Sequence, residues 1–284
     1  MSLAEAVDVK ARYGDEASVL AGGQSLIPML NFRLVRPTAI VDIGGVEALR
    51  HVALDQGTLR VGAMTRQRSL ERVLEAKSPH SLVLQALRHI AHPIIRNRGT
   101  VGGSLAHADP AAELPAALLA LDGQVKVANS ARERWIQARD LFLFHLTTSL
   151  DDDEILVEAE FPAPDRLCAN AVVEVSQRHG DFAAAGVCAT VTAAADRRSI
   201  AGARLAYFGI ATTPVRGDAA ELLLTGEQPS QTLFRAAGRL ASTHCMPPDH
   251  GDAATDYRRH LMVTVTERAL AAATERLKAG RHLR

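Results

Sequence analysis

The sequence predicts an α+β protein with two domains. Its 284 residues are enough for two domains, and Pro162-Ala163-Pro164 has the composition of a linker between them. After this linker, predicted strands come first and predicted helices follow, without the regular alternation of an α/β fold. We therefore expect a first domain over residues 1–163 and a second, with an antiparallel sheet and helices, over residues 168–284.

Capping residues and apolar spacing predict the elements of the first domain. Ser2, Thr65 and Ser81 are suited to begin helices, and Asp109-Pro110 places an N-cap residue directly before a proline at the first helical position. The predicted helices are 2–13, 28–34, 65–77, 81–91 and 109–121, and the predicted strands are 17–21, 40–43, 51–54, 59–61, 124–128 and 155–161.

The second domain has fewer and longer predicted elements. Apolar runs predict strands over residues 171–175, 183–194 and 203–210. Helical patterns follow near residues 230–243 and 254–279.

Composition argues against several classes of protein. Lys+Arg and Asp+Glu both number 32, and aromatic residues make up 4%, which argues against a nucleic-acid binder. The 3 cysteines, Cys168, Cys188 and Cys245, are scattered, which suits a reducing compartment and is too few for an iron–sulfur cluster. Because neither a long apolar run nor a signal pattern is present, we expect a cytoplasmic protein.

Two glycine-rich segments are the main functional candidates. The first glycine motif is Ala21-Gly22-Gly23-Gln24-Ser25-Leu26, and the second is Arg96-Asn97-Arg98-Gly99-Thr100-Val101-Gly102-Gly103-Ser104. Adjacent glycines with small hydroxyl residues allow backbone N–H groups to close on a phosphate, and two such turns suggest two loops around one dinucleotide diphosphate. Plain tight turns would leave the same sequence pattern. No Rossmann or P-loop pattern is present, so a dinucleotide would require another architecture.

Other reactive residues have ordinary interpretations. Arg96 and Arg98 are expected to be solvated in a loop. His107 is expected at the surface and Asp109 at a helix cap, rather than in acid–base work. The set His244, Cys245, Asp249 and His250 matches no common zinc spacing, so we expect no metal.

Both glycine motifs resemble those of a known family. Residues 21–28 and 96–110 resemble the two flavin motifs of the FAD-binding medium subunit of molybdenum hydroxylases, as in bacterial carbon monoxide dehydrogenase and the xanthine dehydrogenase relatives. The resemblance extends to Gly62-Ala63-Met64-Thr65, to residues 178–183 and to residues 257–261, and so covers nearly the whole chain. Family members usually begin with a Phe-x-Tyr-x-x-Pro segment that this sequence lacks. We expect either a start assigned late or the loss of an edge strand from the first lobe.

The resemblance implies a fold and a cofactor site. It implies a two-lobed FAD-binding domain of the vanillyl-alcohol-oxidase/PCMH-like type, with lobes of about residues 1–36 and 37–163, that holds FAD noncovalently. It implies cofactor contacts from Asp109, from Glu113 where the family often has Asp, from Leu156 beside the flavin and from Phe182 over the isoalloxazine. Phe182 could equally be a core residue of the second domain. The implied contacts from the motifs are Ala21, Gly22, Gly23, Gln24, Ser25, Leu26, Thr100, Val101, Gly102, Gly103 and Ser104.

The resemblance also implies a function. The chain would carry electrons through FAD to an external acceptor, from the 2Fe-2S clusters of a small partner subunit. A large partner subunit with the molybdopterin cofactor would oxidise the substrate. Two alternatives remain open: a self-sufficient FAD oxidoreductase that uses NAD(P)H directly, and an assembly module that has lost FAD. Neither metal nor catalytic residues are expected in this chain.

We expect the purified protein to show the visible absorption of an oxidised flavin and to release FAD on denaturation. An absorption spectrum followed by chromatography of the released chromophore checks this. A colourless protein that fails to take up added FAD would contradict the flavoprotein interpretation.

Overall fold

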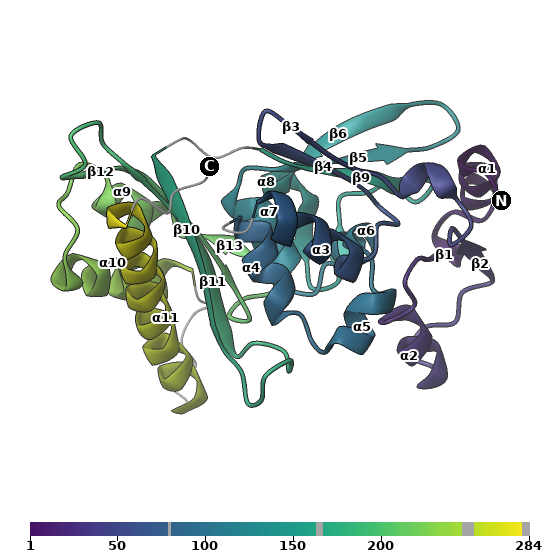
Figure 1. Ribbon diagram of the computed structural model, residues 1–284. Coiled ribbons are helices and arrows are strands. Elements are labelled where there is room, and N and C mark those ends of the chain that lie inside the picture. Colours follow the sequence, from purple (N-terminus) through teal and green to yellow (C-terminus); the bar gives the residue numbers. More distant parts are fainter. Residues whose placement is uncertain (79–80, 163–166, 246–252, 280–284) are drawn as a thin grey trace. The chain divides into compact units, whose positions relative to one another are not determined.

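A computed structural model describes residues 1–78, 81–162, 167–245 and 253–279 (Figure 1). The chain forms two compact units. Unit 1 consists of Met1–Arg72, His92–Asp109 and Asp122–Ala163, and unit 2 of Val73–Ala91, Pro110–Leu121 and Pro164–Arg284. Both units combine helices with mainly antiparallel strands, which confirms the predicted α+β class.

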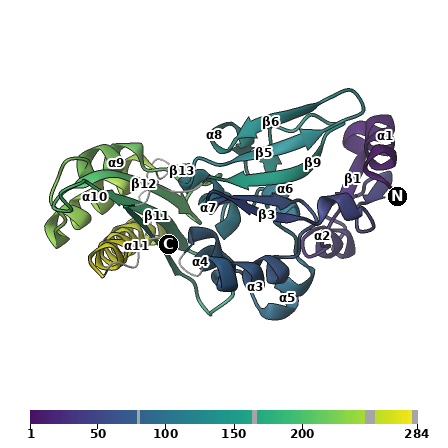
Figure 2. The same cartoon turned by 45° about the horizontal axis from the view of Figure 1, so that its top comes forward.

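Unit 1 is built on a five-stranded antiparallel sheet in the order β3-β4-β9-β5-β6. Figure 2 shows β6, β5, β9 and β3 of this sheet side by side. β9 lies in the middle and pairs Val61 with Ala159 on one side and Val125 with Ala159 on the other. The strands are β3 (Val52–Asp55), β4 (Thr58–Gly62), β9 (Ile155–Phe161), β5 (Gln124–Ala128) and β6 (Glu133–Gln137).

The N-terminal part of unit 1 contains the only parallel strand pair in the part of the chain that the structure describes. β1 (Ala17–Leu20) runs parallel to β2 (Ala39–Asp42), and α2 (Leu26–Asn31) lies between them in sequence. α1 (Leu3–Tyr13) begins with a capping box, because Ser2 and Glu5 each bond the other's backbone N–H group. Ala6 and Val7 of α1 join Val41 and Met64 in one buried cluster, which ties this part to the large sheet.

The remaining elements of unit 1 are short. They are α5 (Pro93–Arg98), α6 (Val101–His107), α8 (Ala138–Leu141) and the hairpin of β7 (Phe142–Phe144) and β8 (Thr147–Thr148), together with the 3-10 turns Gly14–Glu16 and Glu47–Leu49. α3 (Gln67–Lys77) begins in unit 1 and ends in unit 2.

Unit 2 is a four-stranded antiparallel sheet with helices on both faces. The strand order is β10 (Cys168–Val175), β11 (Ala185–Ala193), β12 (Ile200–Phe208) and β13 (Val215–Arg216). α9 (Asp218–Leu224), α10 (Gln231–His244) and α11 (Ala253–Lys278) pack on the face that carries Val187, Leu205 and Tyr207.

The other face of this sheet is covered by α4 (Leu82–His89) and α7 (Glu113–Ala120). All eight residues of α7 are buried, as expected for a helix that is apolar almost all round. α4 begins at Ser81, whose hydroxyl accepts the N–H of Leu84 at 3.2 Å, as the sequence predicts.

One predicted helix start was wrong. Asp109-Pro110 does not begin a helix, because α7 begins at Glu113 with Ala112 as its N-cap residue. The helix before it, α6, ends at Ala108 in the left-handed conformation, φ 53° and ψ 38°, and residues 109–112 connect the two helices. Thr65 also does not cap α3, because its hydroxyl donates to the His51 carbonyl at 2.9 Å.

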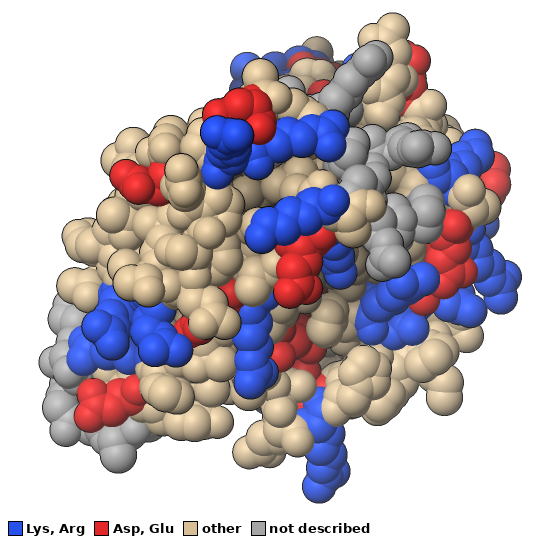
Figure 3. Space-filling view, turned by 60° about the vertical axis from the view of Figure 1, so that its left-hand side comes forward, with Lys and Arg blue, Asp and Glu red and all other residues tan. Residues whose placement is uncertain are grey.

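Surface charge and hydropathy agree with the composition. Figure 3 shows basic and acidic side chains interspersed on the visible face, without a broad area of one sign. Among the described residues, none of the helices is both long and apolar enough to cross a membrane.

We expect Gly186→Ala to lower the free energy of unfolding by about 1–3 kcal/mol, because a Cβ there would lie 2.2 Å from the Phe208 ring on the neighbouring strand. Gly202→Ala on β12 is the matched control, because a Cβ at Gly202 meets no atom within 4 Å. Urea denaturation of both variants checks this, and equal stability of the two would contradict the packing argument.

Candidate functional site

The structure brings the two glycine motifs into direct contact within unit 1. A Cβ placed on Gly22 would lie 2.5 Å from the Arg98 carbonyl oxygen and 2.9 Å from the Gly99 Cα. A Cβ placed on Gly103 would lie 3.4 Å from the Ala21 Cβ. The small residues of each motif therefore allow the backbone of one motif to lie against the other.

The second motif is not the loop that the sequence predicts. Arg96, Asn97 and Arg98 end α5, and Val101 begins α6 after the short connection Gly99-Thr100. Thr100 is the N-cap residue of α6, and its hydroxyl accepts the N–H of Gly103 at 3.0 Å. The cap and the tertiary contacts of α6 outweigh the low helix propensity of adjacent glycines.

The first N–H groups of α6 already have protein partners. Val101 donates to the Thr65 carbonyl at 3.1 Å, Gly102 to the Ala63 carbonyl at 2.9 Å, and Ser104 to the Thr100 carbonyl at 3.2 Å. A Cβ on Gly102 would lie 2.4 Å from the Ala63 Cβ, so α6 rests directly on the Gly62–Thr65 segment. These backbone donors of α6 are engaged, so α6 offers a ligand the Ser104 hydroxyl rather than its first N–H groups.

In the first motif, by contrast, backbone N–H groups are free. In the ranges that the structure describes, the backbone N–H groups of residues 22–26 donate no hydrogen bond to the protein. Gly23 has a φ of 75°, and Ser25 two residues later is in the right-handed helical region. Consecutive free N–H groups around such a left-handed residue form a concave site for an anion.

Arg96 corrects a second expectation, because it is buried rather than solvated. Its Nε donates to Glu71 Oε2 at 3.1 Å, and Arg68 reaches the same oxygen at 2.8 Å. Burial raises the pKa of the Glu71 carboxyl, but Arg68 and Arg96 outweigh that effect, so its pKa is lowered. The ion pair ties α5 to α3 and so fixes the helix that precedes the second motif.

Asp109 and His107 lie at the other end of α6. Both are partly exposed, and Asp109 belongs to unit 1. Burial lowers the pKa of His107, Asp109 opposes that effect, and His145 adds to it. His107 therefore favours the neutral form at neutral pH.

The three outlying predicted contacts have different surroundings. Leu156 is 4% exposed in β9 of unit 1. Glu113 is 8% exposed at the start of α7, and Phe182 is 71% exposed between β10 and β11, both in unit 2. The exposure of Phe182 shows that its interpretation as a core residue was wrong. That Leu156, Glu113 and Phe182 contact the cofactor remains a prediction.

All three cysteines are buried, and the pKa values of two of the thiols are raised. Burial, followed by the charges of Glu113 and Glu174, raises the pKa of the Cys188 thiol well above its usual value. Burial raises the pKa of Cys245 to about 11. Asp249 and His250 lie outside the described residues, and within the described ranges His, Cys, Asp and Glu form no group of three or more that could hold a metal ion.

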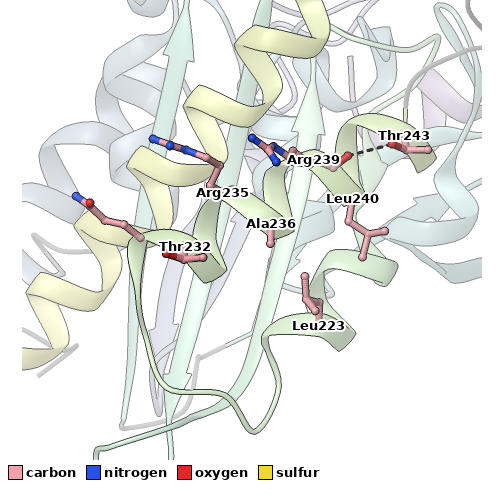
Figure 4. A pocket seen from close by; sticks show the side chains of 8 residues that line it. Leu223, Thr232, Arg235, Ala236, Arg239, Leu240 and Thr243 are labelled. Atoms are coloured by element: carbon pink, nitrogen blue, oxygen red, sulfur yellow. Dashed lines mark hydrogen bonds between the residues drawn. The ribbon is translucent and has the colours of Figure 1, made fainter.

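A groove of about 730 Å³ lies on unit 2 between α9 and α10 (Figure 4). Leu223 of α9 and Leu240 of α10 line it, and Figure 4 shows their side chains turned toward each other. Arg235 on its rim is paired with Glu267 at 3.1 Å. The groove contains none of the predicted site residues.

Comparison with protein families matches both parts of the chain. The FAD binding domain in molybdopterin dehydrogenase matches residues 1–164, and the CO dehydrogenase flavoprotein C-terminal domain matches residues 170–273. The chain belongs to this flavoprotein family. FAD is therefore its cofactor, and the family resemblance of the glycine motifs is confirmed.

Individual relatives are similar to this flavoprotein over nearly its full length. The 6-hydroxypseudooxynicotine dehydrogenase complex subunit alpha of Paenarthrobacter nicotinovorans is 38% identical, with 98% of this chain and 93% of the relative covered. The caffeine dehydrogenase subunit beta of Pseudomonas sp. (strain CBB1) is 37% identical, with 97% and 93% covered. The structure of carbon monoxide dehydrogenase from Hydrogenophaga pseudoflava that lacks the Mo-pyranopterin moiety superposes with a TM-score of 0.89 at 32% identity, over 97% of this chain and 95% of that one.

The residues present fit FAD. A diphosphate is a compact anion, and the free N–H groups of residues 22–26 form the kind of concavity that binds one without a lysine. The second motif packs against the first through Arg98, Gly99 and Gly103.

We expect Gly22→Ala to weaken FAD binding on the order of 10-fold or more, because its Cβ would push the first motif away from the Arg98 carbonyl. Gly45→Ala is the control in the same unit, because a Cβ there meets no atom within 4 Å. Titration of the apoprotein with FAD, followed by flavin fluorescence, measures both variants. Wild-type affinity in Gly22→Ala would show that contact between the motifs is not needed.

Proposed function

We propose that this chain is the FAD-carrying electron-transfer subunit of a molybdenum-cofactor-dependent dehydrogenase. It would pass electrons from 2Fe-2S clusters of a small partner subunit through FAD to an external acceptor. A large partner subunit would carry the molybdopterin cofactor and the substrate site. The observation that carries the proposal is the match of both family domains, joined to a first glycine motif with free anion-binding N–H groups. We place the complex in the cytoplasm.

We assign the two motifs different tasks at the diphosphate. Residues 22–26 would donate their backbone N–H groups to it, and the hydroxyls of Ser25 and Ser104 would add polar contacts. Thr100, Gly102 and Gly103 would hold α6 against Ala21 and Ala63 and so keep the first motif in place. Asp109, Glu113, Leu156 and Phe182 would complete the contacts to the rest of the cofactor.

The protein does not need acid–base residues for this role. FAD supplies the electron-transfer chemistry, and the chain binds the cofactor, orients it and sets its surroundings. The raised thiol pKa values of Cys188 and Cys245 leave both cysteines protonated at neutral pH. The lowered pKa of His107 leaves that side chain without a permanent charge.

Coexpression of this chain with its two candidate partner subunits tests the proposal. We expect one complex on size-exclusion chromatography that contains FAD, iron and molybdenum, measured by chromophore release and elemental analysis. The isolated chain should hold FAD but reduce a dye with NADH only slowly. A chain that never associates with the iron- and molybdenum-containing subunits, and that turns over NADH rapidly alone, would contradict the proposal and favour a self-sufficient oxidoreductase.

A further inference from the structure

Arg66 and Arg98 lie where the two glycine motifs meet, and Arg50 lies near Arg66. The Arg66 guanidinium donates a hydrogen bond to the Arg98 carbonyl, the same oxygen on which Gly22 packs. The Arg50 guanidinium donates to the Gly44 carbonyl, in the turn that follows β2. Burial lowers the pKa of Arg66, and the charges of Arg50 and Arg98 lower it further, so each of these two cations lies within electrostatic reach of Arg66.

Acidic side chains pair with Arg50 but not with Arg66 or Arg98 among the described residues. Arg50 has a carboxylate partner in Glu47, which lies at 3.3 Å and is 82% exposed. For Arg66 and Arg98, none of the described carboxylates lies within ion-pair distance. A guanidinium group does not release its proton in proteins, so the mutual repulsion persists in the free chain.

Three other arginines of unit 1 are neutralised by carboxylates. Arg60 pairs with Glu160 at 2.7 Å and Arg134 with Glu154 at 2.6 Å. Arg96, only two residues before Arg98, pairs with Glu71. Arg66, in contrast to these three, has no carboxylate partner among the described residues and bonds the carbonyl on which Gly22 of the first motif packs, where backbone N–H groups are also unpaired.

Both kinds of donor favour the same ligand chemistry. Arginine binds phosphate oxygens through paired N–H groups, and free backbone N–H groups in a concave turn bind the same anion. Because Arg66 and Gly22 both contact the Arg98 carbonyl, an anion held by the first motif would lie close to the Arg66 guanidinium.

We propose that Arg66 and Arg98, with Arg50 at the edge, form a cationic phosphate subsite that takes the diphosphate of FAD. The proposal rests on the proposed function, because it assumes that the first motif binds the cofactor. Arg66 would act in two ways: its charge attracts the diphosphate, and its hydrogen bond holds the second motif in place. Inorganic pyrophosphate and the phosphates of a nicotinamide dinucleotide carry the same chemistry and serve as probes.

Titration of the apoprotein with FAD, in Arg66→Gln and Arg66→Lys, tests the subsite. We expect Arg66→Gln to weaken FAD binding on the order of 10- to 100-fold, because a charge-assisted contact to phosphate is lost. Arg66→Lys should retain part of the affinity for FAD, since lysine keeps the positive charge but lacks the paired N–H donors of the guanidinium group. Arg60→Gln, on the same unit with an exposed and paired arginine, is the matched control and should bind FAD as the wild type does.

Inorganic pyrophosphate separates a phosphate subsite from a structural role. Pyrophosphate should compete with FAD for the wild type and for Arg60→Gln, and much less for Arg66→Gln. The thermal midpoint of each apoprotein should stay close to that of the wild type. Unchanged FAD affinity in Arg66→Gln would overturn the proposal, as would equal loss in Arg66→Gln and Arg60→Gln.

Further results distinguish a failure of the phosphate subsite from a failure of the proposed function. If Arg66→Gln changes NADH binding to the FAD-loaded protein but leaves FAD affinity intact, the subsite belongs to a nicotinamide dinucleotide and the proposal is wrong. Normal assembly with the partner subunits would show that the proposed function survives. If the wild type does not bind FAD at all, the proposed function itself fails.

Discussion

The contact between Gly22 and the Arg98 carbonyl is the constraint on which the candidate site depends. Any larger residue at position 22 would separate two backbones that now touch, and Arg66 bonds the same carbonyl oxygen. This contact places the end of α5 against a turn whose own N–H groups are unpaired, and Gly103 of α6 packs on Ala21 in the same turn. Rigid support matters because unpaired donors bind an anion well only when they are fixed before it arrives. The second motif therefore holds the backbone in place, and the first motif provides free N–H donors.

The sequence predicted the family and its cofactor better than the conformation of the glycine motifs. Paired glycines and hydroxyl residues marked both motifs, and family resemblance identified FAD. The helical state of the second motif was missed because two adjacent glycines are unfavourable in a helix, and the deciding contacts come from Ala63, Thr65 and Ala21, which are distant in sequence. The start of α7 was misplaced for a related reason: Asp109-Pro110 is a good local signal, but the left-handed Ala108 and the packing of α7 set the boundary instead.

The burial of charged residues could not be predicted from their neighbours in the sequence. An arginine near a glycine turn is usually solvated, yet Arg96 is buried against Glu71, 25 residues earlier in the chain, while Arg98 stays exposed. Alternation along α5 places the two on different sides of a six-residue helix, and only the fold decides which side meets a carboxylate. The capping box of α1 and the Ser81 cap of α4, by contrast, involve partners three residues apart and were predictable from the sequence.

Unit 2 is formed by three separate segments of the chain, and this has a consequence for folding during synthesis. α4 and α7 are synthesised before residue 122, but the sheet that covers them, β10–β13, begins only at Cys168. Until that sheet emerges from the ribosome, an eight-residue helix that ends up wholly buried has no surface to cover it. A fragment cut at the linker would keep the glycine motifs yet carry an uncovered apolar helix. The two family segments are thus separate in sequence but interdependent in folding.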